Sequence, residues 1–72
     1  MSGAGGTDLV YMANQIARFF ASQGDAAAAV KGVADHMKSF WSPDMRAKLQ
    51  ARIAAGDAPD LSPLARDAVN LL

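Results

Sequence analysis

The sequence predicts an all-α protein, a small bundle of three main helices plus a short C-terminal fourth helix. Apolar residues recur every three or four positions along most of the chain, as on one face of a helix. A residue type that favours helix starts precedes each such stretch, and no stretch shows the alternation and β-branched residues of a strand. Because the chain has 72 residues, we expect one helical domain over residues 7–72, after a flexible glycine-rich segment over residues 1–6.

The first helix is predicted over residues 8–23. Its apolar positions follow helical spacing: Leu9, Met12, Ala13, Ile16, Phe19 and Phe20. Thr7 is the expected N-cap. Gly24 is expected to end the helix in a left-handed conformation, and Asp25 to cap the next helix after a very short turn.

The second helix is predicted over residues 26–40, beginning with four alanines, which are strong helix formers. Its apolar face carries Val30, Val33, Met37 and either Phe40 or Trp41. Gly32 inside this helix costs about 1 kcal/mol relative to alanine. We therefore expect another helix to approach closely at Gly32.

Two Ser-Pro pairs predict the remaining helix starts. At Ser42-Pro43 the serine suits the N-cap and the proline suits the first helical position. The third helix should run from Pro43 to about residue 55 and stop at Gly56. The second pair, Ser62-Pro63, opens the short fourth helix.

Composition limits the function classes. Seven basic and seven acidic residues balance, so no net charge favours nucleic acid or a membrane surface. No apolar run approaches the roughly 18 residues of a membrane span, and no signal peptide is recognisable. The absence of cysteine fits a cytoplasmic protein, and without disulfides or a structural zinc site we expect so small a core to depend on association.

The search for catalytic residues finds only weak candidates. His36 stands beside Asp35 and three residues before Ser39, but neighbours on a helix point about 100° apart, so Asp35 is poorly placed to orient the imidazole. Asp57 and Asp60 lack the spacing of a calcium loop. The glycines at residues 3–6 lack the other residues of a phosphate-binding loop. We therefore predict no catalytic, cofactor-binding or metal-binding residues in this chain.

Two other function classes remain open from the residues alone. Arg46, Lys48 and Arg52 could form a nucleic-acid-binding face on a helix-turn-helix, although Asp44 at the start of that helix would repel phosphate. The chain could also be a self-associating helical protein without an enzyme partner.

The bulky side chains suggest a protein-binding surface. Phe20 and Phe40 are expected in the core, but so small a bundle cannot bury every aromatic residue. An exposed aromatic beside an arginine is typical of an interface hot spot, so Trp41 with Arg46 is the leading anchor. The predicted partner interface consists of Phe19, Trp41, Met45 and Arg46.

Three blocks of sequence carry a family resemblance: MANQIARFFA at residues 12–21, VADHM at 33–37 and FWSPDMR at 40–46. In order and spacing they resemble the delta subunit of NAD-dependent formate dehydrogenases, with a weaker match through residues 61–71. The family pattern has an acidic residue after the tryptophan and a basic residue before the methionine, where this chain has Ser42 and Asp44.

The resemblance implies a place in a cytoplasmic, multi-subunit enzyme that interconverts formate and carbon dioxide. Such an enzyme uses a molybdenum or tungsten pterin cofactor, iron–sulfur clusters and FMN, all held by other subunits. This chain would be a non-catalytic accessory subunit that binds and stabilises the large catalytic subunit and supports its assembly. The alternative within the same system is a transient maturation factor that helps to insert the pterin cofactor.

Overall fold

The computed structural model describes residues 8–72, and all regular secondary structure in this part of the chain is helical. Four helices follow one another: α1 (Leu9–Ala21), α2 (Ala26–Phe40), α3 (Pro43–Ala54) and α4 (Pro63–Val69). The predicted all-α class, with three main helices and a short fourth one, is confirmed. The expected flexible segment, residues 1–6, lies outside the described residues.

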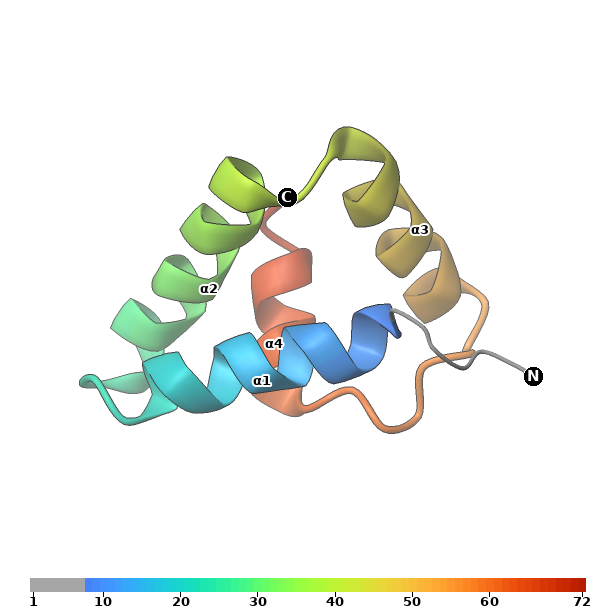
Figure 1. Ribbon diagram of the computed structural model, residues 1–72. Helices are drawn as coiled ribbons and strands as arrows, with labels where there is room; N and C mark the ends of the chain where they lie inside the picture. Colours follow the sequence, from blue (N-terminus) through green and yellow to red (C-terminus); the bar gives the residue numbers. More distant parts are fainter. Residues whose placement is uncertain (1–7) are drawn as a thin grey trace.

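The shortest helix occupies the middle of the bundle. Figure 1 shows α1 crossing the front of the molecule, with α2 and α3 rising on either side and α4 lying behind α1 and between them. α4 packs against all three other helices, and α1 does the same. The interior of the protein is therefore enclosed by α1 and α4, with α2 and α3 closing its two sides.

Every helix begins at a residue whose side-chain oxygen accepts a hydrogen bond from a free backbone N–H of the first turn. These N-caps are Asp8, Asp25, Ser42 and Ser62. The last three confirm the sequence prediction. The predicted N-cap of the first helix, Thr7, is wrong: Asp8 Oδ1 accepts from the backbone N–H of Val10 at 2.9 Å, and Thr7 itself lies outside the described residues.

The two glycines that were expected to end helices behave differently. α3 ends at Ala54, just before Gly56, which confirms Gly56 as the predicted stop, and Gly56 has a left-handed φ of +72°. No other residue in 8–72 has a positive φ, so the left-handed conformation predicted for Gly24 is wrong. Instead α1 ends at Ala21, before the expected end at residue 23, and the right-handed Ser22 closes its last turn.

Alanine substitutions should separate these two glycines. Gly56→Ala is expected to lower the free energy of unfolding by about 1 kcal/mol, because its Cβ is strained in the left-handed region. Gly24→Ala meets no atom within 4 Å and restricts the unfolded chain, so it should raise stability by about 0.4 to 1 kcal/mol. Urea unfolding followed by circular dichroism would measure both changes. Effects of the same sign would contradict the difference in backbone conformation.

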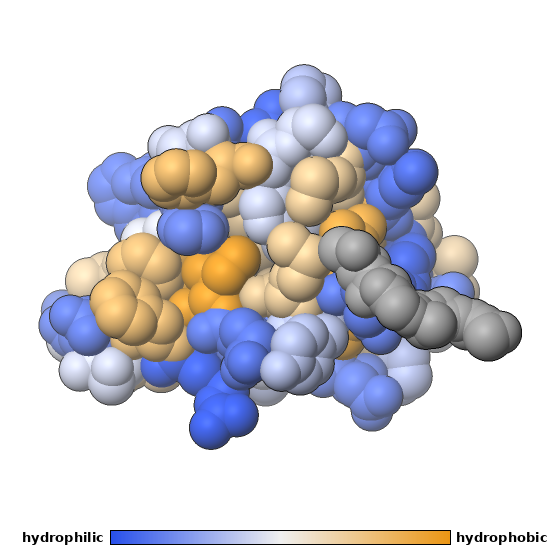
Figure 2. Space-filling view, in the orientation of Figure 1, coloured by the Kyte–Doolittle hydropathy of each residue, from blue (hydrophilic) through white to orange (hydrophobic). Residues whose placement is uncertain are grey.

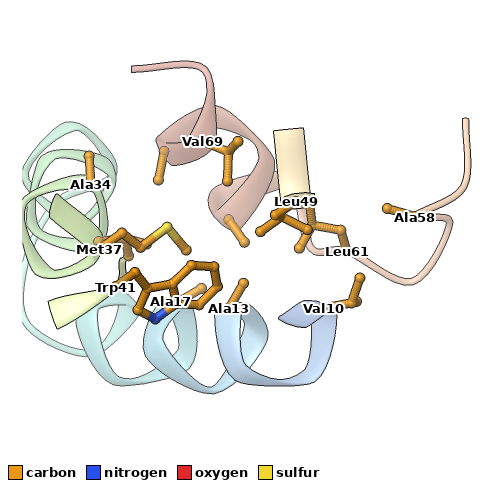
Figure 3. Packing of buried hydrophobic residues seen from close by; sticks show 13 residues of the cluster. Val10, Ala13, Ala17, Ala34, Met37, Trp41, Leu49, Ala58, Leu61 and Val69 are labelled. Carbon is orange, nitrogen blue, oxygen red and sulfur yellow. The ribbon is translucent and has the colours of Figure 1, made fainter. Parts of the chain in front are cut away.

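The core combines many small side chains with a few large ones. Seven of its fourteen buried apolar residues are alanines: Ala13, Ala17, Ala29, Ala34, Ala58, Ala65 and Ala68. Alanines let helix backbones approach closely, so little interior volume remains to be filled. Met37, Leu49 and Trp41 fill much of it, and Figure 3 shows these side chains pointing inward between α1 and α4.

The side chain of Asn14 in α1 forms two hydrogen bonds with the long connection between α3 and α4. Asn14 Nδ2 donates to the backbone carbonyl of Asp60 at 2.9 Å, and Asn14 Oδ1 accepts from the backbone N–H of Ser62 at 2.8 Å. Both ends of the amide group are thus used by backbone groups more than forty positions away in sequence. These two hydrogen bonds, which we call the Asn14 bracket, hold the start of α4 against the middle of α1.

Candidate protein-binding surface

Four rings lie next to one another where the end of α1 meets the second half of α2. We call them the aromatic row: Phe19, Phe20, His36 and Phe40. Ring centroids are 5.1 Å apart for Phe19 and Phe20, 6.3 Å for Phe20 and His36, and 4.7 Å for His36 and Phe40. The first two pairs meet edge to face, which is a favourable geometry for aromatic rings.

Helical spacing and one glycine bring these rings together. His36 and Phe40 are four residues apart, so both lie on the same face of α2. Phe20 reaches that face from α1 because Gly32, one turn before His36, has no side chain. A Cβ built on Gly32 would lie only 2.5 Å from Phe20 Cδ1. The close helix approach that was predicted at Gly32 is therefore confirmed.

The outer members of the row are open to solvent. Phe19 is 61% exposed and Phe40 is 75% exposed. The predicted burial of Phe40 is thus wrong, while Phe20 and His36 are half-buried. Figure 2 shows hydrophobic surface gathered over the α1 and α2 side of the molecule. An exposed cluster of large aromatic side chains is characteristic of a protein-binding site.

No Lys, Arg, Asp or Glu belongs to the row. The ion pair nearest to it in sequence on α2 joins Lys31 Nζ to Asp35 Oδ2 at 3.2 Å, and these charges largely offset each other. Asp35 is therefore paired with Lys31. A partner that covers this surface needs mainly apolar side chains in contact with the rings.

Trp41 is buried in the structure, contrary to the prediction from the sequence. Trp41 was expected to be exposed at the corner between α2 and α3, but it is only 5% exposed and belongs to the core. The helix ends at Phe40, and Trp41 has an extended backbone with φ −91° and ψ 142°. Because the backbone of Trp41 is no longer helical, its side chain does not continue a face of α2, and the indole points into the core (Figure 3). The exposed ring at this corner belongs to Phe40, which was predicted to lie in the core and not in the interface.

The other two residues of the predicted corner surface support the fold. Met45 is half-buried and packs against the core. Arg46 Nη1 donates to the backbone carbonyls of Lys38 at 3.1 Å and Trp41 at 3.3 Å, so it satisfies acceptors at the end of α2. Of the four residues predicted for the partner interface, only Phe19 joins the aromatic row.

Two of the three basic residues considered for nucleic-acid binding, Lys48 and Arg52, lie in ion pairs. Lys48 Nζ lies 3.2 Å from Asp44 Oδ2, one turn away on α3. Arg52 Nη1 lies 3.5 Å from Asp8 Oδ1, and its Nε lies 3.9 Å from Asp57 Oδ2. Asp44, which departs from the family pattern, is thus part of a local ion pair within the helix.

No three His, Cys, Asp or Glu side chains in residues 8–72 come close enough to hold a metal ion. None of the four helices has the length and hydrophobicity that crossing a membrane requires.

The family comparison covers almost all of the described chain. Residues 8–69 match the model of a family described as the NADH-dependent formate dehydrogenase delta subunit FdsD. No curated protein and no solved structure matched the sequence. The matched segment contains all four helices, the aromatic row and the Asn14 bracket. The chain therefore belongs to the family of NADH-dependent formate dehydrogenase delta subunits.

Proposed function

We propose that this chain is a non-catalytic accessory subunit of a cytoplasmic formate dehydrogenase. It binds the large catalytic subunit, stabilises it and supports assembly of the complex. The molybdenum or tungsten pterin, the iron–sulfur clusters and FMN belong to the other subunits. In this proposal the chain contributes binding surface and no reacting group.

The observation that carries the proposal is the exposed aromatic row on a very small domain. A core of this size rarely contributes more than about 3 to 5 kcal/mol of stability, so natural domains of this length often depend on association. Covering Phe19 and Phe40 would remove large apolar surface from water, at about 25 cal/mol per Å² of buried area. The rings are held in place by their neighbours, which reduces the entropy lost on binding.

Co-expression tests the proposal directly. The catalytic subunit would be produced with and without this chain, and bound pterin, complex size and formate oxidation would be measured. Retention of the chain at a fixed ratio in the active complex supports the accessory role. Loss of the chain after pterin insertion would indicate a maturation factor instead. Identical pterin content, size and activity without the chain would reject both.

Alanine substitutions in the row should weaken the complex without unfolding the chain. We expect Phe19→Ala and Phe40→Ala each to raise the dissociation constant by about tenfold or more, as for hot-spot aromatics. Isothermal titration calorimetry with the purified catalytic subunit would measure this. Tyr11→Ala is the matched control, because Tyr11 is an exposed aromatic on α1 outside the row. If all three variants bind equally well, the aromatic row is not the docking surface.

A further inference from the structure

His36 is the one polar side chain of the aromatic row. Its ring centroid lies 6.3 Å from that of Phe20 and 4.7 Å from that of Phe40, so it stands between a ring of α1 and a ring of α2. The imidazole is half-buried. A partner that covers the exposed rings at both ends of the row, Phe19 and Phe40, therefore also covers the imidazole between them.

The ring nitrogens of His36 reach water in the free chain. No hydrogen bond within residues 8–72 involves the imidazole. At the same time, no side-chain nitrogen or oxygen of the described chain is both buried and without a hydrogen-bond partner. A partner that covers the row must therefore replace this water by a hydrogen bond, or leave a buried polar group unsatisfied at a cost in affinity.

No charged side chain of the described chain forms an ion pair with His36. The charged residues of α2, of the two helices that pack against it and of their N-caps are Asp8, Arg18, Asp25, Lys31, Asp35, Lys38, Arg66 and Asp67. All ion pairs in residues 8–72 join other side chains, and Asp35, next to His36 in sequence, pairs with Lys31. Lys38, two positions from His36, points about 200° away around α2. The described chain thus offers no paired carboxylate that would stabilise a protonated imidazole.

We propose that the catalytic subunit docks on the aromatic row with His36 uncharged, and that it presents one uncharged hydrogen-bonding group to the imidazole. The inference rests on the proposed function, because it assumes that this subunit covers the row. Replacing water by apolar side chains disfavours the charged form of an ionisable group. A neutral imidazole has one donor and one acceptor, so a hydroxyl or a backbone group among apolar side chains can satisfy it.

The neighbouring rings leave this preference unchanged. Aromatic faces attract cations, so Phe20 and Phe40 give some stabilisation to an imidazolium. Both rings belong to this chain and lie beside His36 before and after docking, so their attraction largely cancels in the binding equilibrium. What changes is the loss of water, which favours the neutral ring. Docking at acidic pH must therefore remove a proton, and binding should weaken as the pH falls through the range of about 5 to 8 in which histidine changes charge.

Isothermal titration calorimetry of this chain with the purified catalytic subunit, at about pH 8 and about pH 5.5, tests the proposal. We expect the dissociation constant of the unmodified chain to be about tenfold higher at the lower pH. His36→Gln keeps a donor and an acceptor but carries no charge, so its dissociation constant should change much less. Ionisable groups of the catalytic subunit act on both proteins alike, so the difference belongs to His36. Asp35→Asn, which alters the neighbouring ionisable residue, is the control and should keep the full dependence.

Nuclear magnetic resonance gives a second readout on the unmodified chain, so it holds even if a substitution weakens the complex. His36 is the only histidine, so isotope-labelled histidine in this chain reports on that ring alone. At a pH at which the imidazole of the free chain is protonated, adding the catalytic subunit should shift its signals to those of a neutral ring. Signals of a protonated ring in the complex, or equal pH dependence for the unmodified chain and His36→Gln, would overturn the inference and leave the accessory role intact. Failure of the unmodified chain to bind at either pH would overturn both.

Discussion

Replacing Trp41 by alanine is expected to lower the free energy of unfolding by about 3 to 5 kcal/mol. The indole is 5% exposed and lies in a core in which seven of the fourteen buried apolar residues are alanines. Neighbouring alanines cannot extend to fill the vacated volume, so a cavity remains and its lining loses van der Waals contacts. The expected loss is comparable to the whole stability of a domain of this size.

Far-UV circular dichroism during urea unfolding is the suitable measurement, because Trp41 is the only tryptophan and its removal abolishes tryptophan fluorescence. Phe40→Ala is the matched control, since this neighbouring ring is 75% exposed. Its effect on stability should stay within about 0.5 kcal/mol. Similar unfolding curves for the two variants would contradict the assignment of Trp41 to the core and Phe40 to the surface.

Which of the two neighbouring rings, Phe40 or Trp41, is buried could not be predicted from the sequence. The sequence predicted correctly that the bundle could not bury every aromatic ring, but it did not identify which ring stays outside. Helical periodicity applies up to Phe40, whereas Trp41 is the first residue with an extended backbone. The direction of its side chain depends on how α3 returns toward α1, which is a tertiary feature.

Helix starts were predictable where the capping chemistry is local. Asp25, Ser42 and Ser62 each accept from a backbone N–H three residues ahead, and this pattern is visible in the sequence. At the first helix two consecutive residues, Thr7 and Asp8, are both suitable caps. Asp8 also lies 3.5 Å from Arg52 of α3, a contact that local sequence cannot show.

The aromatic row was only partly visible in advance. The spacing of His36 and Phe40 and the glycine at position 32 were both present in the sequence, and the close helix approach at Gly32 was predicted. The link to Phe20 requires knowing the crossing of α1 and α2. The hydrogen bonds of Asn14 could not be predicted from the sequence. Asparagine on a helix is ordinarily solvated, and the two backbone partners of Asn14 lie on a connection that is distant in sequence.

Leu49→Ala is the second substitution with a large expected effect, about 2 to 5 kcal/mol of lost stability. Leu49 is the only buried residue of α3, and its exposed fraction is zero. Met45 and Ile53, one turn to either side, are only partly buried. The packing of α3 on α1 and α4 therefore depends mainly on one side chain.

Because the packing of α3 depends on Leu49, we expect the Leu49→Ala substitution to destabilise this helix more than the others. Hydrogen exchange in Leu49→Ala should increase most in residues 43–54, because α3 loses its central contact while α1, α2 and α4 still pack together. Gln50→Ala, at the next and exposed position, is the control and should leave exchange unchanged. A uniform increase across all four helices would instead mean that α3 and the rest of the bundle unfold as one cooperative unit, with Leu49 stabilising the whole core.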